Sequence, residues 1–559
     1  MKKIIWVFLM LGLSACIRPV VNLAPKLRPS TLVSSSSTEF LIEGQQLFPL
    51  SVLIAGQTTQ ILETDPNGTF VKVKILSALP SGSYTVQVNN ASASATAQAG
   101  ITVLETNDIF ANADYGTLAT RNQYILGGRG VLAFKPNANR VAVLAAIANA
   151  DFSVTQTQEP FVPNSNSVCG QAIALLSDNK VNRSVIEGLN TLQKSLETLE
   201  ADVGFDLNAE YVADEPSAGL SQMPSLESAP SVRPAAIPTD LSTARVAVLD
   251  SGVSPHPIFA IPSGGNFIDT AAARNFTTEG TITDVSDLAT ERSPDGTPIT
   301  SSNIGHGTAV AGIIGATILK TFAPMASAYT AQMDKMVVPI KTCEGAAGRC
   351  RNSSVVLGVC YAVSLNTGSN PVKVINLSLG SKYPSSLLFS ALTEASARGM
   401  SIITSAGNKG LVVSKPPNFP ANHSIATQGS FEAIAGLVSV ASVEQIPATT
   451  IFKASDFSSQ ANSVSISANG VVQSLAANGL SLSPTALRVF SGTSFSAPQV
   501  SAAASLYYAQ NTGLTAITPE TFKQKLISTA IPSGTANFQS CPSNKCGAGL
   551  LNILGILAL

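Results

Sequence analysis

Short apolar runs alternate with helical patterns through the C-terminal part of the chain, from residue 244 to residue 559. The runs are nearly continuous, which is typical of strands buried on both faces of a sheet. They occupy 246–249, 336–340, 374–377 and 401–404, and helical patterns lie between them at 354–367 and 385–399. Strands and helices in this alternation predict a doubly wound parallel sheet, so we expect an α/β fold for this part.

Residues 38–105 follow a different pattern, in which apolar and polar residues alternate along short stretches such as 70–75 and 84–88. Alternation with a period of two is typical of half-buried strands. The sequences Pro-Asn-Gly at 66–68 and Pro-Ser-Gly at 80–82 supply turns between such strands. We therefore predict a small all-β sandwich here.

Residues 120–212 mix both kinds of element. Strand patterns stand at 131–134, 171–176 and 204–211, and helical patterns stand at 139–150 and 184–199. Units of this size predict a small, compact α/β domain. Two stretches rich in Pro and Ser, 16–37 and 213–243, read as a tether and as an exposed linker, the kind of segment in which proteolytic nicking concentrates.

The N-terminus has the layout of a secretory signal. Two lysines follow Met1, and an apolar run too short to span a bilayer extends over 4–13. The sequence Leu-Ser-Ala then precedes Cys16, which resembles a bacterial lipobox. We expect residues 1–15 to be removed, Cys16 to be lipidated and the protein to be exported and anchored at the cell envelope. Ile17 after the lipobox implies sorting to the outer membrane in a Gram-negative host. An ordinary signal peptide is the alternative.

Composition and cysteine content narrow the picture further. Of the chain's 559 residues, 45% are hydrophobic and 12% are charged, a composition that is not typical of a disordered chain. The net charge of -1 gives no electrostatic reason to expect binding to nucleic acid. An even set of cysteines besides Cys16 predicts disulfides in an exported chain. Proximity suggests Cys343–Cys350 and Cys541–Cys546, and elimination leaves Cys169–Cys360, although six cysteines allow fifteen pairings. A zinc site is the rival interpretation, which the scarcity of histidine and the lack of a Cys-x-x-Cys pair disfavour.

Four residues are candidates for chemistry. Asp250 and Asn408 follow the predicted strands 246–249 and 401–404, and sites in open α/β sheets form at the carboxyl ends of strands. His306 lies between two glycines at the start of an apolar helix, where it can act as a general base or merely cap the helix. Ser494 precedes a small-residue helix beginning at 497, so backbone N–H groups there favour a developing oxyanion. Pro498 is expected in the first turn of that helix.

Three motifs together carry a family resemblance. Asp-Ser-Gly at 250–252, His-Gly-Thr at 306–308 and Gly-Thr-Ser-Phe-Ser-Ala-Pro at 492–498 resemble the signatures of the subtilases, in the order Asp, His, Ser. The segment ending at Asn408 resembles the one that carries the family's oxyanion asparagine. The segments 457–459 and 547–552 are similar as well. The resemblance covers about 244–559 and implies a subtilisin-like fold and a serine endopeptidase.

The resemblance also implies a role for each matching residue. Ser494 is the nucleophile, His306 the general base, Asp250 the group that orients His306, and Asn408 an oxyanion donor. Two stretches are implied to bind the substrate backbone: Ser378, Leu379 and Gly380, and Ser405, Ala406 and Gly407. Protein and peptide substrates are the expected partners, and no cofactor is required for the chemistry.

Several features depart from the family pattern. Phe495 stands where a Met is usual, and 422–435 resembles an insertion beside the specificity pocket, which leaves the cleavage preference open. His423 in that insertion is expected at the surface, and His256 is expected to be structural. A structural Ca²⁺ is possible through Asp284, Asp287 and Asp295, but a solvated acidic loop is the favoured interpretation.

The N-terminal domains have resemblances of their own. Segments 42–48 and 80–84 resemble an IPT/TIG immunoglobulin-like module, which is expected to be a spacer. The domain 120–212 resembles in topology the subtilase propeptide, which implies a folding aid and inhibitor, and 213–243 would then contain the maturation site. The rival hypotheses are an adhesion protein built on an inactive protease, disfavoured because all four candidate residues are present, and a surface scaffold in which the β-sandwich recruits a partner. Sedolisin-like chemistry is disfavoured because His306 is retained.

Overall fold

The structure is a computed structural model, and it describes only part of the chain. The described residues are 26–28, 31–33, 39–43, 47–54, 56–66, 68, 70–76, 82–90, 94–96, 101–104, 125–134, 138–163, 165–179, 192, 203–213, 241–261, 264–277, 280–287, 305–321, 330–344, 348–381, 385–408, 410, 418–425, 433–475, 487–512 and 517–557. The chain divides into two compact units, one formed by 1–105 with 114–117 and the other by 106–113 with 118–559. The signal region, Cys16 and most of the predicted helix 184–199 lie outside the described residues.

The first unit is all-β, as the alternating pattern predicts. Its central pairings are antiparallel, β3 (Glu39–Glu43) with β7 (Phe70–Lys74) and β4 (Pro49–Ile54) with β9 (Val86–Asn90). The remaining strands are β5 (Gln57–Thr58), β6 (Gln60–Thr64), β8 (Gly82–Tyr84), β10 (Ser94–Thr96) and β11 (Ile101–Leu104). Alternate residues of β7 and β9 are buried with Ile42 and Leu47 in one apolar core. Its likeness to an immunoglobulin module stays a prediction.

The predicted tether 16–37 is partly incorporated into this unit. Strand β1 (Lys26–Arg28) pairs with β3, and β2 (Thr31–Val33) pairs in parallel with β11. Both strands are only three residues long, so neither produces a readable alternation in the sequence. The unit therefore begins before residue 38.

The second unit contains an antiparallel sheet built mainly from residues 125–213. Its strands are β12 (Ile125–Phe134), β13 (Phe152–Gln158), β14 (Ala172–Asp178) and β15 (Val203–Ala213), with helix α1 (Arg140–Asn149) between the first two. Strands β12, β14 and β15 match the predicted positions, whereas β13 was not predicted. All of these strands pair antiparallel in the order β13-β14-β12-β15.

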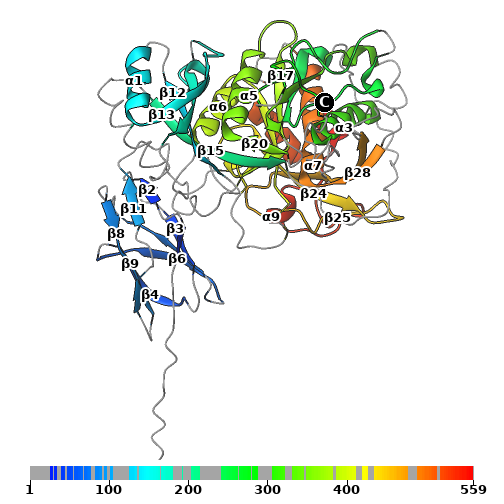
Figure 1. The fold of residues 1–559 in the computed structure, drawn as a ribbon. Helices are drawn as coiled ribbons and strands as arrows, with labels where there is room; N and C mark the ends of the chain where they lie inside the picture. Colours follow the sequence, from blue (N-terminus) through cyan, green and yellow to red (C-terminus); the bar gives the residue numbers. More distant parts are fainter. Residues whose placement is uncertain are drawn as a thin grey trace, which may run out of the picture. The chain divides into compact units, whose positions relative to one another are not determined.

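Strand β15 continues this sheet into the residues that follow the linker. It pairs antiparallel with β20 (Arg349–Arg351) and with β22 (Leu379–Gly380), and β20 pairs with β19 (Cys343–Glu344). The predicted domains 120–212 and 244–559 therefore share one sheet (Figure 1).

The largest sheet is parallel in most of its pairings, as the continuous apolar runs predict. Its order is β17-β18-β16-β21-β23-β24-β25, and β26 also pairs with β24. Only the β24–β25 pairing is antiparallel. The strands are β16 (Arg245–Asp250), β17 (Arg274–Asn275), β18 (Val337–Lys341), β21 (Val372–Leu377), β23 (Ser401–Ser405), β24 (Leu437–Gln445), β25 (Phe452–Ala454) and β26 (Ile466–Asn469). Every residue of β16, β18 and β23 is buried, which explains why their sequences lack alternation.

Helices cover both faces of this sheet. Helix α3 (His306–Thr321) and helix α7 (Thr493–Gln510) belong to one apolar core with the sheet, together with α8 (Pro519–Ser528) and α10 (Ile553–Leu557). Helix α5 (Asn352–Ser364) and helix α6 (Ser386–Ala397) belong to a second core, on the side where the β12–β15 sheet packs (Figure 1). The doubly wound α/β fold is thus confirmed. Strands β27 (Val471–Leu475) and β28 (Leu487–Ser491) form a hairpin, and α9 (Ser543–Cys546) is a short helix.

The order of the sheet places a topological switch point beside β16. The chain passes from β16 to β18 on one side and later to β21 on the other, so the direction of winding reverses there. Ligands of open α/β sheets bind at such a switch point, outside the carboxyl ends of the strands. Asp250 is the last residue of β16, and Ser378 follows β21 directly.

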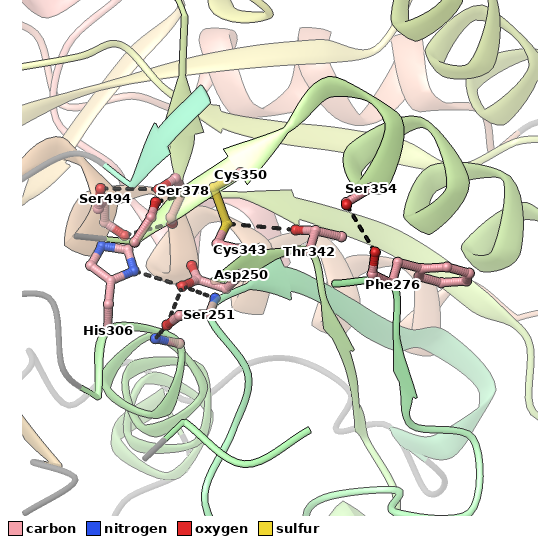
Figure 2. The surroundings of a disulfide bond; sticks show 12 residues. Asp250, Ser251, Phe276, His306, Thr342, Cys343, Cys350, Ser354, Ser378 and Ser494 are labelled. Carbon is pink, nitrogen blue, oxygen red and sulfur yellow. Dashed lines mark hydrogen bonds and ion pairs between the residues drawn. A yellow bond between two sulfur atoms is a disulfide. The ribbon is translucent and has the colours of Figure 1, made fainter. Parts of the chain in front are cut away.

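All three expected disulfides are present, which confirms the pairing reached by elimination. Cys169 bonds to Cys360, Cys343 to Cys350 and Cys541 to Cys546. The second closes the β19–β20 hairpin close to the switch point (Figure 2). A search of the described helices finds none with the length and apolar character needed to cross a membrane.

Candidate active site

Asp250 ends β16 with its carboxylate buried and held by several donors. Its Oδ1 accepts hydrogen bonds from the Ser251 backbone N–H at 2.7 Å and the Ser251 hydroxyl at 3.1 Å. The same oxygen lies 2.8 Å from Nδ1 of His306. These contacts fix the carboxylate, so Asp250 is positioned to accept a hydrogen bond from the Nδ1–H of His306.

His306 begins helix α3, and the glycines beside it allow the close packing that aligns it. Gly305 has a φ of 81°, a left-handed conformation that favours glycine. A Cβ on Gly307 would lie 2.1 Å from the carbonyl oxygen of Gly252, so only glycine fits at that position. Because Nδ1 donates to Asp250, Nε2 is the ring nitrogen that can accept a proton. Figure 2 shows the imidazole between Asp250 and the segment that carries Ser494.

Ser494 is the second residue of α7, a helix buried along nearly its whole length. Its hydroxyl donates to the carbonyl oxygen of Ser378 at 3.3 Å. The ring of the next residue, Phe495, lies 5.1 Å from the ring of His306, so the first turn of α7 packs against the histidine. Asp250, His306 and Ser494 therefore converge from three separate elements (Figure 2).

The expected start of the helix at 497 is wrong, and so is the expected place of Pro498 in its first turn. Helix α7 begins at Thr493, which places Pro498 inside the helix. A proline has no N–H to donate to the carbonyl four residues earlier, which here belongs to Ser494. The hydroxyl of Ser378 donates to that carbonyl instead, at 2.7 Å. Ser378 is itself fixed by Asn376, whose amide donates to its hydroxyl at 3.0 Å.

Asn408 follows β23, and its amide is oriented by Thr493. The Oδ1 of Asn408 accepts from the backbone N–H of Thr493 and from its hydroxyl, both at 2.9 Å. Since a backbone N–H can only donate, the accepting atom is the amide oxygen and not the nitrogen. Nδ2 therefore faces away from Thr493. A Cβ built on Gly492 would lie 3.1 Å from Nδ2, so this nitrogen is close to the Gly492 backbone. The Nδ2 group of Asn408 therefore lies beside the backbone that leads into Ser494.

The predicted substrate-binding stretches lie at two neighbouring strand ends. Ser378, Leu379 and Gly380 follow β21, while Ser405, Ala406 and Gly407 end and follow β23, which pairs with β21. In β22, Gly380 pairs with Val212 and Leu379 pairs with Ala213 of β15. The edge formed by β22 thus pairs with an extended backbone, and in this structure that backbone is strand β15 of the same chain.

Sequence reasoning missed Asn418, whose side chain lies between the two stretches. Its Nδ2 donates to the carbonyl oxygen of Ser405 at 3.3 Å. A Cβ on Gly380 would come within 2.3 Å of this amide, and one on Gly407 within 3.1 Å. Gly380 and Gly407 are the signal in the sequence that could have indicated Asn418, because their missing Cβ atoms leave the space that its side chain fills.

His423 is buried, so its expected surface position is wrong. It retains 1% of its exposure and packs against Phe389 and Phe419, each with ring centroids 5.0 Å away. Burial lowers the pKa of His423 to about 3, so it is neutral at neutral pH. His256 is structural as expected, because its Nδ1 accepts from the Ile258 N–H at the start of a short 3-10 helix.

Asp287 is a second buried carboxyl beside the site, linked to the first turn of α3. Its Oδ2 accepts from the backbone N–H and the hydroxyl of Thr308, both at 2.8 Å. Burial raises the pKa of Asp287 to about 6, and the nearby charge of Asp250 acts in the same direction. Among the described residues no group of three or more His, Cys, Asp or Glu side chains could hold a metal ion. Asp295, the third candidate for Ca²⁺, lies outside them.

The Asp287→Asn variant should change how stability depends on pH. The folded pKa of Asp287 lies above its ordinary value of 3.8, so the native state binds this proton more tightly than the unfolded state. The resulting stabilisation is present below about pH 4 and is lost as the pH rises through about 6. Between pH 4 and pH 7 the free energy of unfolding of the wild type should therefore fall by about 2 kcal/mol more than that of the variant. Urea unfolding at both pH values measures this, and parallel pH dependences would contradict it.

Comparison with known proteins agrees with this geometry. The model of the subtilase family (peptidase S8) matches residues 242–549, which is more than half of the chain. Subtilisin BL from Lederbergia lenta is 32% identical over 169 residues, covering 30% of this chain and 49% of the relative. The thermostable alkaline protease of Halalkalibacterium halodurans is 29% identical over 264 residues, covering 47% of this chain and 56% of the relative. The chain thus spans about half the length of these curated relatives.

A solved structure shares the fold. Fervidolysin from Fervidobacterium pennivorans, a keratinolytic enzyme related to subtilisin, superimposes with a TM-score of 0.51 and 17% sequence identity, covering 78% of this chain and 62% of the other. At this identity the likeness concerns the fold alone. The family model also matches the segment that contains Asp250, His306 and Ser494. The shared fold and this match lead to one conclusion. The chain belongs to the subtilase family.

Proposed function

We propose that this protein is a serine endopeptidase that hydrolyses peptide bonds of proteins through an acyl-enzyme. The observation that carries the proposal is the 2.8 Å contact between Asp250 and Nδ1 of His306, with Ser494 at the start of the helix that packs against the same histidine. Membership of the subtilase family supports it, as do relatives named as alkaline proteases. We further propose Asp250, His306 and Ser494 as its catalytic triad.

The reaction proceeds in two halves. Nε2 of His306 takes the proton of the Ser494 hydroxyl while Oγ attacks the peptide carbonyl, and Asp250 stabilises the imidazolium that forms. His306 then gives the proton to the leaving amine, and the acyl group stays on Ser494. A water molecule repeats the sequence in the second half, which releases the carboxylate product and restores Ser494.

The oxyanion of each tetrahedral intermediate is stabilised by Nδ2 of Asn408 and by the backbone N–H of Ser494. Thr493 supports this role, because it holds the other end of the Asn408 amide with two hydrogen bonds. Fixed donors of this kind need no reorganisation when the charge develops, which is why they lower the barrier.

Substrates bind as extended strands along Ser378, Leu379 and Gly380, with Ser405, Ala406 and Gly407 on the other side. The pairing of β15 with β22 supports this, and it also supports an inhibitory, propeptide-like role for residues 120–212. Export and lipid anchoring through Cys16 complete the proposal. They rest on the N-terminal sequence, and mass spectrometry of the N-terminal peptide tests them.

Labelling with a fluorophosphonate probe tests the enzyme proposal. Wild type should be labelled after cleavage of the linker 214–240, because the probe reacts only with an activated serine. Ser494→Ala should not be labelled, whereas Ser496→Ala should, because the Ser496 hydroxyl donates to the Ala468 carbonyl and lies outside the triad. Folded, linker-cleaved wild type that resists the probe would contradict the proposal and favour a binding protein built on an inactive protease.

A further inference from the structure

A covalent bond joins the two sides of the linker 214–240. Cys169 lies in the 3-10 helix Val168–Gly170, before the linker, and Cys360 lies in α5, after it. Their sulfurs are 2.02 Å apart, and the two residues are separated by 191 positions in the chain. Both are buried, with exposures of 1% and 0%, so neither sulfur is open to attack by thiols in solution.

The surroundings of this disulfide are also shared between the two sides. Val131, Ala133 and Val168 belong to the same apolar core as residues of α5 and α6. The N–H of Val168 donates to the Ser390 hydroxyl of α6 at 3.2 Å. The ring of Phe161 lies 5.7 Å from the rings of Phe276 and Tyr361. The disulfide therefore lies in a packed interface and does not bridge two loosely apposed surfaces.

The register of β15 directs the chain toward the nucleophile. Val212 pairs with Gly380 and Ala213 with Leu379, so the next position in this register faces Ser378. The carbonyl oxygen of Ser378 is the group that lies 3.3 Å from the Ser494 hydroxyl. Strand β15 therefore ends, at Ala213, one register position short of the residue whose carbonyl contacts Ser494.

We propose that this protein matures into two chains that stay covalently joined through Cys169–Cys360, so that the N-terminal piece is retained and not shed. The inference rests on the proposed function, since Ser494 makes the cut. One peptide bond is hydrolysed by one water, which leaves a carboxylate on the N-terminal piece and an amine on the C-terminal piece. The disulfide takes no part, and no oxidant or reductant is consumed.

Retention has two consequences. A tethered inhibitory strand stays at a fixed effective concentration near the site, whereas a released one is lost on dilution. After the cut the strand can leave the site and rebind, so an irreversible probe still labels Ser494 while the strand is open. The lipid proposed at Cys16 also lies on the N-terminal piece, together with the all-β unit. The disulfide is thus the covalent link between the catalytic residues and the membrane anchor after the cut.

Denaturing gels and intact mass of the purified full chain test the proposal. Without reductant the wild type should run as one species with the mass of the uncut chain plus one water. With reductant it should give two pieces, and the mass of the N-terminal piece should place its carboxyl end within the linker 214–240. Ser494→Ala should remain one uncut chain under both conditions.

Paired substitutions supply the matched comparison. Cys169→Ala with Cys360→Ala should give two separate pieces even without reductant. Cys541→Ala with Cys546→Ala removes a disulfide contained within the C-terminal piece, so this variant should behave as the wild type does. If the first variant fails to fold, comparing the wild type with and without reductant still shows whether a disulfide joins the two pieces.

Three results would overturn the inference. They are wild-type pieces that separate without reductant, the same cut in Ser494→Ala, and a wild type that stays uncut although the fluorophosphonate probe labels it. The last result leaves the proposed enzyme intact and refutes only the two-chain product. A wild type that is neither cut nor labelled after linker cleavage refutes the enzyme proposal itself, so the two failures are distinguishable.

Discussion

Replacing His306 with alanine is expected to lower kcat on a peptide substrate by about 10⁶-fold, with little change in KM. The variant keeps the proposed oxyanion donors and the strand edge proposed to bind substrate, but it loses the imidazole that is proposed to take the Ser494 proton. Asp250 cannot substitute, because its Oδ1 contacts the far side of the imidazole. The measurement is steady-state hydrolysis by the mature protein, with folding checked by circular dichroism.

Two further variants sharpen this prediction. Adding Ser494→Ala to His306→Ala should cost little more, because residues that act as one unit are grossly non-additive. His256→Asn is the matched histidine control, since asparagine can also accept the N–H bond that His256 receives from Ile258. Its kcat should stay within about tenfold of wild type. Two results would refute the triad. One is a double variant whose loss of kcat equals the product of the two single losses, and the other is a His306→Ala enzyme with near-normal turnover.

The sequence was most informative where chemistry is encoded locally. Asp250 ends one short buried strand and Ser378 follows another. The carboxyl ends of neighbouring parallel strands meet at one edge whatever the lengths of the loops between them. Gly307 marks a backbone packed too closely for a Cβ, and Gly305 has a φ of 81°, so both positions favour glycine and can be recognised in the sequence. The sheet and the neighbourhood of the candidate triad could therefore be predicted.

Features that depend on contacts distant in sequence could not be predicted in this way. The start of α7 was misplaced because Pro498 normally marks the first turn of a helix, and the hydroxyl that compensates for its missing N–H belongs to Ser378. His423 was expected at the surface because a polar residue in an apparent insertion shows no apolar periodicity. Its burial comes from Phe389 on another helix.

The join between β15 and β22 escaped prediction for a related reason. A two-residue strand such as Leu379–Gly380 has no pattern of its own, and its partner is separated from it by the whole linker. The sequence therefore suggested two domains where the structure has one continuous sheet. Cysteine counting alone indicated the connection, since Cys169 and Cys360 were left over when the near pairs were made.

Asn408→Asp is expected to lower kcat by about 10²–10³-fold or more while leaving the fold nearly unchanged. The carboxylate oxygens can still accept both bonds from Thr493, so the loop after β23 keeps its support. The N–H donor beside Ser494 is replaced by a negatively charged acceptor, which repels the developing oxyanion. KM should change little, because the ground-state carbonyl makes less use of this donor than the intermediate does.

Asn408→Ala separates the donor from its support. It removes the same N–H, so its kcat should fall by about 10²–10³-fold as well, but it also leaves the buried N–H of Thr493 without its acceptor, at a cost of about 1–3 kcal/mol in unfolding free energy. Thr493→Val keeps the backbone N–H bond to Oδ1 but removes the hydroxyl, which donates to Oδ1 and accepts from the Gly407 N–H at 3.0 Å. It should reduce kcat far less than either variant, because Nδ2 is retained. Suppose that kcat of Asn408→Asp stayed within about tenfold of wild type while kcat of Asn408→Ala fell by about 10²–10³-fold. The asparagine would then act by supporting Thr493 and not as an oxyanion donor. Comparing kcat with urea unfolding for all three variants therefore decides which end of this one amide matters for the reaction.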